Sequence, residues 1–261
     1  MKVVILAGGY GSRLAEETSQ RPKPMIEIGG RPILWHIMKL YGRHGLTDFV
    51  VCLGYKGFMI KEYFANMQLH DSDVTVDLAK AEITYHGSVR EPWRVTLVDT
   101  GEATLTGGRL KRAAPWLDEG EPFCMTYGDG VADIDVSALI AFHKRHGRAA
   151  TITAVAPPGR YGALDLASDA RVLRFTEKPP GDHSLISGGF FVLEPSVIDR
   201  IGGDATPFES EPLESLARDG ELMAFRHEGF WAAMDTLRDK NHLESLWESG
   251  QAPWAVWERP A

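Results

Sequence analysis

The stretch with the clearest chemical potential lies near the N-terminus, where a glycine-rich loop follows an apolar run. Val3 to Ala7 reads as a strand buried on both faces, and Gly8 to Leu14 then runs GGYGSRL. Glycines let backbone N–H groups come close to a phosphate or a base, and Arg13 adds a cation that suits phosphate oxygens. We therefore expect this loop to bind an anionic ligand.

This loop fits neither of two common phosphate-binding motifs. It lacks the G-x-x-x-x-G-K-[ST] pattern of a Walker A loop. Gly9 and Gly11 begin a dinucleotide fingerprint, but Leu14 stands where the third glycine is required. The acidic residue expected ~20 residues later is also absent, since the chain there reads Gly-Arg-Pro at 30–32. A nicotinamide-dependent reductase is therefore disfavoured.

A second basic group follows at Lys23, which lies between Pro22 and Pro24. The two prolines predict a stiff extended segment that holds the ammonium with little loss of entropy. A fixed ammonium of this kind can stabilise negative charge in a transition state. The alternative is an ordinary surface turn, and the residue types alone leave both open.

One carboxylate has a position that suits ligand binding. Asp129 comes directly after the apolar run 123–127 and is flanked by Gly128 and Gly130. In a parallel sheet this places the carboxylate at the carboxyl edge, where such folds bind ligands. Asp133 and Asp135 are rivals, but they precede a helix expected from Val136, and we predict that they cap it.

The elements that must position these residues alternate along the first part of the chain. Apolar runs predict strands at 3–7, 48–53, 94–98, 123–127 and 149–156, and helical spacing predicts helices at 32–45, 56–67, 107–117 and 136–146. Such alternation is typical of an α/β fold with a Rossmann-like, mixed but mostly parallel sheet flanked by helices.

The character of the sequence changes beyond Pro157. Antiparallel strands are expected at 161–166 and 171–177, further strands at 188–193 and 222–227, and helices at 212–218 and 239–248. Trp254 and Trp257 follow in the tail, and we expect them to pack on the body of the protein or on a second subunit. We predict a single domain over 1–261, with a core at about 1–156 and an appended β-rich part at about 157–261.

Composition narrows the function classes. The chain has 261 residues, a formal net charge of −8 and 44% hydrophobic residues, so a broad nucleic-acid-binding surface is not expected. No apolar run approaches the ~18 residues that cross a membrane. Cys52 and Cys124 lie in apolar runs and are expected to be buried reduced thiols, as in a cytoplasmic protein.

These motifs together resemble the sugar-phosphate nucleotidyltransferases. The loop L-A-G-G-x-G-[ST]-R-L followed by K-P-M matches the family signature, and the resemblance continues at 106–112 (TGGRLKR), 127–133 (YGDGVAD) and 234–236 (MDT). It therefore runs almost end to end. Only residues 14–22 separate Arg13 from Lys23, whereas related thymidylyl- and uridylyltransferases usually have a longer stretch there. This short spacing resembles the branch formed by the glucose-1-phosphate cytidylyltransferases.

The resemblance implies a reaction and its metal. The family transfers the cytidylyl group of CTP to α-D-glucose 1-phosphate with Mg²⁺, and by matching positions Asp129 and Asp235 are the metal ligands, with Arg13, Lys23 and Asp129 as catalytic residues. Its product feeds dideoxysugar synthesis for the O-antigen of lipopolysaccharide. Its members are homo-oligomers, for which the segment 74–93 and the tryptophan-rich tail are the only support in this sequence.

Matching positions also imply which residues contact the substrates. The loop residues up to Gly9 would contact cytosine and ribose, those from Gly11 to Arg13 the triphosphate, and Thr104 and Arg109 the base. The full set implied to bind the nucleotide is Leu6, Ala7, Gly8, Gly9, Tyr10, Gly11, Ser12, Arg13, Lys23, Thr104, Arg109 and Gly128. The set implied to bind the sugar phosphate is Glu177, Lys178 and Gly188. For Glu177 and Lys178 the alternative is an exposed ion pair between strands.

Three other functions stay open at this point. The same chemistry could use dTTP or UTP, or CTP with another phosphorylated acceptor. A non-catalytic nucleotide-binding regulatory subunit would keep the fold but lose Arg13, Lys23 or an aspartate of the metal pair, and all of these are present.

Overall fold

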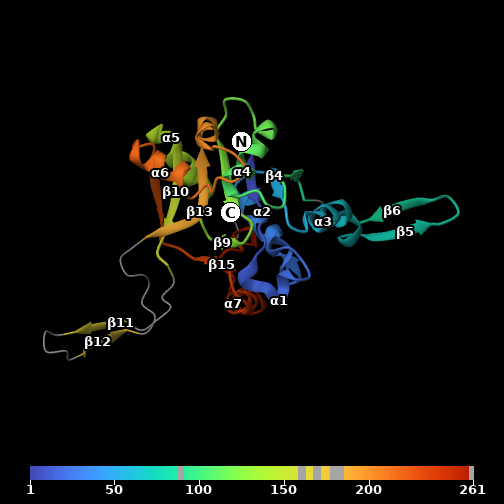
Figure 1. Cartoon of the computed structure of the whole chain (residues 1–261). Helices are drawn as coiled ribbons and strands as arrows, with labels where there is room; N and C mark the ends of the chain where they lie inside the picture. Colours follow the sequence, from blue (N-terminus) through green and yellow to red (C-terminus); the bar gives the residue numbers. More distant parts are fainter. Residues whose placement is uncertain (88–90, 158–162, 167–171, 177–184, 259–261) are drawn as a thin grey trace.

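A seven-stranded sheet runs through the middle of the molecule (Figure 1). The computed structural model describes residues 1–87, 91–157, 163–166, 172–176 and 185–258. The strands lie in the order β14 (Leu222–His227), β10 (Ala150–Val155), β13 (Ile186–Leu193), β8 (Phe123–Tyr127), β1 (Val3–Leu6), β4 (Asp48–Leu53) and β7 (Arg94–Asp99).

The direction of the strands confirms the predicted mixed, mostly parallel sheet. Strand β1 is parallel to both β4 and β8, β4 is parallel to β7, and β10 is parallel to β14. Strand β13 runs antiparallel to both of its neighbours, β8 and β10. The carboxyl ends of β1, β4 and β8 therefore meet at one edge, where parallel sheets bind ligands.

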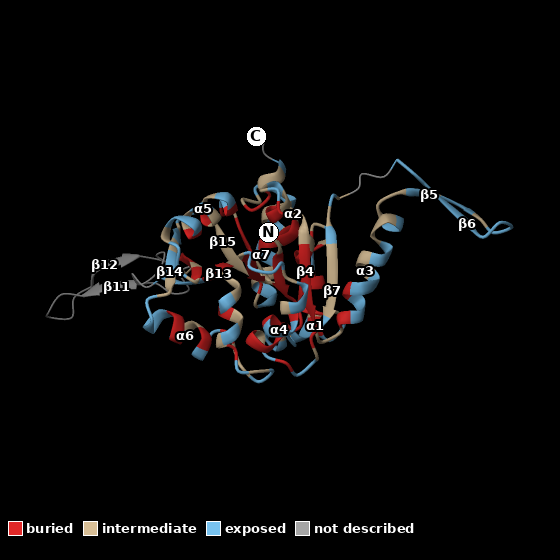
Figure 2. Ribbon diagram, turned by 90° about the horizontal axis from the view of Figure 1, so that it is seen from above, coloured by how far each residue is buried: buried red, intermediate tan, exposed pale blue. Residues whose placement is uncertain are grey.

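Alternate residues of the central strands supply two hydrophobic layers. Val3 and Ile5 of β1 pack in one buried cluster with α2 (Ile33–Arg43). Val4 and Leu6 face the other way and pack with α4 (Thr106–Ala113) and α6 (Glu211–Arg218). Because both faces are covered, these strands are continuously apolar, and Figure 2 shows burial concentrated at the centre of the sheet.

Three further helices follow the sequence pattern: α3 (Gly57–His70), α5 (Val136–His146) and α7 (Leu237–Glu248). The short helix α1 (Ala15–Thr18) was not predicted. Helix α4 is shorter than predicted, because it gives way to a 3-10 turn, η3 (Ala114–Trp116), that contains Pro115. No helix among the described residues has the length and apolar character needed to cross a membrane.

The second part of the chain adds strands both to the central sheet and beside it. Strands β13 and β14 join the central sheet. The predicted antiparallel pair is present as β11 (Ala163–Leu166) with β12 (Val172–Thr176), which form a two-stranded sheet of their own. The last segment of β-structure, β15 (Trp231–Ala233), pairs with β9 (Gly130–Ala132) directly after β8.

Two other short antiparallel pairs complete the strands of the described residues. β2 (Glu27–Ile28) pairs with β3 (Arg31–Pro32) just before α2. β5 (Asp73–Asp77) pairs with β6 (Glu82–His86), and this hairpin projects away from the body of the molecule (Figures 1 and 2). Its side chains include the exposed apolar residues Val76, Leu78 and Ile83.

The C-terminal tail packs on the body, as one of the two predicted alternatives stated. Trp254 is fully buried, stacks with Phe230 at a ring-centroid distance of 5.6 Å, and donates its indole N–H to Nδ1 of His36 at 3.3 Å. Trp257 lies against Trp35 in an edge-to-face contact at 5.7 Å. The tail thus covers the outer side of α2.

Candidate active site

A cleft of about 320 Å³ opens at the carboxyl ends of β1 and β8. Its walls come from the loop after β1, from residues 23–24, from the segment that leads into α4, and from the end of β8. Every residue implied to bind the nucleotide lines this cleft, and so does Asp129. Six further residues line the cleft and were given no nucleotide-binding role from the sequence: Pro24, Glu102, Ala103, Leu105, Thr106 and Tyr127.

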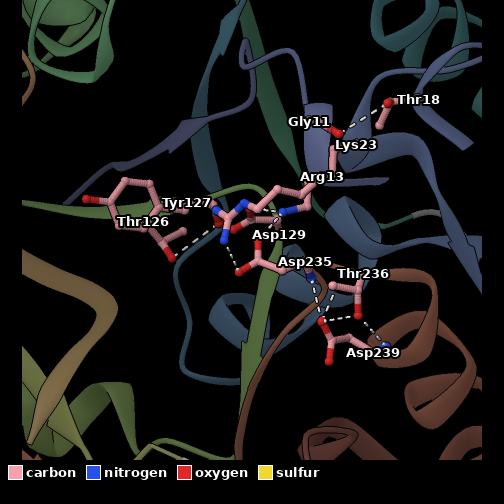
Figure 3. Close-up of polar contacts among 10 residues, drawn as sticks. All are labelled: Gly11, Arg13, Thr18, Lys23, Thr126, Tyr127, Asp129, Asp235, Thr236 and Asp239. Atoms are coloured by element: carbon pink, nitrogen blue, oxygen red, sulfur yellow. Dashed lines mark hydrogen bonds and ion pairs between the residues drawn. The ribbon is translucent and has the colours of Figure 1, made fainter. Parts of the chain in front are cut away.

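Lys23 lies between two carboxylates at this cleft. Its Nζ is 2.7 Å from Oδ2 of Asp129 and 2.7 Å from Oδ1 of Asp235, and Figure 3 shows all three side chains converging. Burial lowers the pKa of Lys23, but the charge of Asp129 and the hydrogen bonds to both aspartates outweigh it and keep the pKa above its usual 10.5. Lys23 is therefore a fixed cation, as its proline neighbours suggested.

The backbone around Lys23 differs from the extended segment that we predicted. Pro22 is extended, but Lys23 begins a 3-10 turn, η2 (Lys23–Met25), in which Pro24 takes one of the first positions. Both prolines still restrict the chain, because each has φ fixed near the value its conformation needs. The stiffness was predicted correctly and the local conformation was not.

A short strand pair brings the two aspartates together. Asp129 directly precedes β9, and Asp235 comes two residues after the end of β15. Gly130 lies opposite Ala233 in this pair, and the amide of Met234 donates to the carbonyl of Asp129 at 2.9 Å. The antiparallel register therefore places residues 129 and 235 at the same end of the pair, although they are far apart in the sequence.

The N-terminus of α7 holds the backbone of Asp235. Thr236 caps this helix, and Oδ2 of Asp239 accepts hydrogen bonds from the amides of Asp235 at 3.1 Å and Thr236 at 2.8 Å. This is a capping box, which stabilises the start of a helix. The positive end of the helix dipole also favours a negative charge at Asp235.

Arg13 reaches one of these carboxylates, that of Asp235, from the glycine-rich loop. Its Nη1 lies 3.0 Å from Oδ2 of Asp235, but its side chain is 74% exposed. Exposed ion pairs of this kind contribute at most about 1 kcal/mol, so the pair does not lock the guanidinium. Gly11 gives the loop its turn, with φ of +64° and no room for a side chain beside Thr18.

Arg109 fastens the walls of the cleft to one another. Its two Nη nitrogens donate to the carbonyls of Gly8, Leu53, Gly101 and Glu102 and to Oγ1 of Thr100, at 2.8 to 3.0 Å. A Cβ at Gly8 would lie 2.1 Å from Nη1 of Arg109, so only glycine fits there. Base recognition by Arg109 stays a prediction, and the structure adds a role in holding the loop after β1.

The residues implied to bind the sugar phosphate are only partly described. Glu177 and Lys178 lie outside the described residues. Gly188 is buried in β13, its carbonyl accepts the indole N–H of Trp231 at 2.7 Å, and an added Cβ would lie 2.9 Å from Val155. Packing against β10 therefore explains this glycine, and its contact with a sugar stays a prediction.

The two rival aspartates have different environments. Asp135 is the N-cap of α5 and accepts from the amide of Ala138 at 2.9 Å, as predicted. Asp133 does not cap that helix, so this half of the prediction is wrong. Its Oδ1 lies 3.1 Å from Nε2 of His227, because the β9–β15 pair draws it toward the end of β14.

The glycine-rich loop, Arg13, Lys23 and Asp129 thus line one cleft at the carboxyl edge of a mostly parallel sheet, and Asp235 joins them through Lys23. Such an arrangement suits a phosphorylated ligand. Residues 2–239 match the family model described as "Nucleotidyl transferase", and the chain belongs to this family.

Individual relatives narrow the class. The chain is 62% identical over 99% of its length to the whole of a protein from Salmonella typhimurium named "Glucose-1-phosphate cytidylyltransferase". It is 44% identical over 98% of its length to the whole of a Bacillus subtilis protein named "Probable glucose-1-phosphate cytidylyltransferase". A solved structure of HddC from Yersinia pseudotuberculosis superposes with a TM-score of 0.69, covering 94% of this chain and 99% of HddC at 24% identity, and supports the fold.

Proposed function

We propose that this chain transfers the cytidylyl group of CTP to α-D-glucose 1-phosphate. A phosphate oxygen of the sugar phosphate attacks the α-phosphorus of CTP in line with the bond to the β-phosphate. That bond breaks, CDP-D-glucose forms, and pyrophosphate leaves. The observation that carries the proposal is the 62% identity over 99% of the chain to a protein named for this activity.

The geometry of the cleft supports this chemistry. Both reactants are anions, so the protein must offset their repulsion and align them. In the proposed reaction the backbone amides of Gly11 to Arg13 hold the triphosphate, and Arg13 pairs with its oxygens. Lys23 is already a fixed and buried cation that lines the cleft, and we assign it to the α-phosphate or the departing pyrophosphate.

We propose that Asp129 and Asp235 hold Mg²⁺. Their carboxylates are hard oxygen donors that meet at one point, since Lys23 reaches both at 2.7 Å. Among the described residues no group of three or more His, Cys, Asp or Glu side chains could hold a metal. Two carboxylates nevertheless fit Mg²⁺, which usually takes one or two from the protein and completes its shell with water and substrate phosphates. When bound, Mg²⁺ would offset the charge of the phosphate oxygens.

The same proposal covers the domain organisation, the oligomeric state and the location of the enzyme. We assign residues 1–261 to one nucleotidyltransferase domain, in which β11, β12 and the residues after them bind the sugar phosphate. We also propose a homo-oligomer, supported by the exposed apolar residues of the β5–β6 hairpin. A cytoplasmic location is supported by Cys52 and Cys124, which are both free and buried. The product would feed O-antigen synthesis.

Pyrophosphate release tests the proposal directly. Glucose 1-phosphate is supplied with CTP, UTP, dTTP, ATP or GTP in parallel, with Mg²⁺ or with EDTA, and mannose 1-phosphate serves as a second acceptor. We expect release with CTP and glucose 1-phosphate, abolished by EDTA. Release with UTP or dTTP instead would keep the metal site and overturn the assignment of the base. Silence with every pair would overturn the proposed activity.

A further inference from the structure

The glycine pair Gly107-Gly108 has no role in the proposed chemistry, yet the structure shows what it permits. The segment 203–209, between η4 (Pro195–Arg200) and α6, lies directly against the start of α4. A Cβ at Gly107 would lie 2.6 Å from the carbonyl oxygen of Thr206, and one at Gly108 would lie 2.5 Å from Cα of Asp204. The two glycines are therefore needed for the 203–209 segment to come this close.

Polar contacts fasten this segment to the helix along its length. The amide of Leu105 donates to the carbonyl of Asp204 at 2.8 Å, and the amide of Gly108 donates to the carbonyl of Thr206 at 3.2 Å. The Asp204 carboxylate accepts from Nε and Nη2 of Arg112 at 2.8 and 2.5 Å. The segment is also anchored in the core, because Phe208 is fully buried and packs edge-to-face on Phe191 of β13 at a ring-centroid distance of 5.7 Å.

Glu209, at the end of this segment, bridges two walls of the cleft. Its Oε2 accepts from Oγ1 of Thr106 at 2.6 Å, and its Oε1 accepts from the hydroxyl of Tyr127 at 2.5 Å. Thr106 is the first residue of α4, Tyr127 is the last residue of β8, and both line the cleft. The hydroxyl of Thr106 in turn accepts from the amide of Phe208 at 2.8 Å, so it has little freedom to rotate.

Tyr127 has its own constraints. Burial, together with the neighbouring charge of Glu209, raises the pKa of Tyr127 far above its usual 10, so the phenol stays protonated and donates. Its ring fills the space that a side chain at Gly189 would need, since an added Cβ there would lie 2.8 Å from the ring. Because β13 fixes the ring and Glu209 fixes the hydroxyl, the Tyr127 side chain is held in one conformation.

We propose that Glu209 is a positioning residue that sets the separation between the α4 side and the β8 side of the nucleotide cleft. It acts through Thr106 and Tyr127 and does not touch the reacting atoms. The inference rests on the proposed function, because the ligand of the cleft is taken to be CTP. Its consequence is that Glu209 controls how tightly and how selectively the base is held, while the reacting groups at Lys23 and Asp129 keep their arrangement.

The test compares Glu209→Ala, Glu209→Gln and the control Glu211→Ala. Glu211 is a neighbouring exposed glutamate that pairs with Arg218 and lies outside the cleft. We expect Glu209→Ala to raise KM for CTP about tenfold, since two charge-assisted hydrogen bonds are lost, and to narrow the preference for CTP over UTP. The kcat and the KM for glucose 1-phosphate should change less than about threefold, which a general loss of structure would not allow.

Two further measurements separate positioning from other effects. The amide oxygen of Glu209→Gln can still accept from one hydroxyl, so this variant should recover part of the affinity. In a double-mutant cycle, Tyr127→Phe should raise KM for CTP less in the Glu209→Ala background than in the wild type, because the shared contact is already gone.

The outcomes distinguish this inference from the proposed function. A KM for CTP within twofold of wild type in Glu209→Ala would overturn it. A general loss of activity would also overturn it, seen as a lower kcat, a lower kcat/KM for both CTP and glucose 1-phosphate, and a lower Tm. Fully additive effects in the cycle would overturn it too. If the wild-type chain releases no pyrophosphate with CTP, the proposed function fails first, and this inference fails with it.

Discussion

Replacing Lys23 with methionine should change catalysis and metal binding in opposite directions. In the structure Nζ of Lys23 takes one oxygen of Asp129 and one of Asp235, both at 2.7 Å. These are the carboxylates to which we assign Mg²⁺. A divalent ion that binds without nucleotide must therefore compete with an ammonium already bound there. When CTP is present, its phosphates offer that ammonium another partner.

The size of this competition follows from the two contacts. A hydrogen bond to a charged group contributes about 1.5 to 3 kcal/mol, and the ion must displace Nζ from at least one carboxylate. Methionine has a similar length and no charge, so Lys23→Met removes this cost. At about 1.4 kcal/mol per factor of ten, the variant should bind a divalent ion about 10- to 100-fold more tightly in the absence of nucleotide. Its kcat/KM should nevertheless fall at least ~100-fold, because transition-state charge loses a fixed cation.

Mn²⁺ is the probe for this measurement, since its free ion gives an EPR signal that is lost on binding. Wild type and Lys23→Met are titrated at pH 8 without and with CTP, and Lys240→Met is the matched control because Lys240 pairs with Glu17. The gain should disappear when Asp129→Asn is added to Lys23→Met. Equal or weaker binding of Mn²⁺ by folded Lys23→Met would refute the reasoning, since the ion and the ammonium would then not share these oxygens.

Three further outcomes are expected. Asp129→Asn should lower kcat/KM at least ~100-fold in the pyrophosphate assay while the circular dichroism spectrum is unchanged. Near-normal turnover would refute the catalytic role of Asp129. Gly8→Ala should raise KM for CTP at least ~10-fold, because its Cβ would lie 2.1 Å from Nη1 of Arg109; unchanged KM and Tm would show that the loop can shift freely. Burial lowers the pKa of His36 from 6.5 to about 4, so the folded state stays neutral while the unfolded state takes up a proton below pH 6.5. The free energy of unfolding should therefore fall by up to about 3 kcal/mol between pH 6.5 and 4, and urea titrations of His36→Gln should show a flatter dependence on pH over that range.

The central sheet could be predicted because each of its strands has a local cause. The bounds of β4, β8, α5 and β14 agree with the sequence pattern to the residue. Long apolar runs that alternate with amphipathic helices can bury themselves in few ways, so pattern and fold agree. The glycine-rich loop and Asp129 were predictable for the same reason, since each follows directly after one of these strands.

The rest of the site depends on pairings that leave little local trace. Strand β15 has three residues, Trp231–Ala233, and no alternating pattern that distinguishes it from a loop. Its partner β9 is equally short, so the register that places Asp235 beside Asp129 could not be derived from the residues. Asp235 was predicted only through the resemblance to a family. Asp133 was misassigned for the same reason, because its contact with His227 depends on the fold of β9 and β14.

The cleft has two kinds of element: the strands of the central sheet, which form its walls, and short segments from later in the chain, which add side chains to it. The sheet fixes the loop after β1 and the end of β8, and it would do so for many nucleotides. The elements specific to this site come from later in the chain: β15 brings Asp235 to Lys23, and the 203–209 segment brings Glu209 to Thr106 and Tyr127. Each contributes a carboxylate to a site whose scaffold is already complete without it. Substitutions at these later carboxylates should therefore alter metal binding or nucleotide selectivity while the sheet stays intact, whereas substitutions in β1 or β8 should destabilise the fold itself.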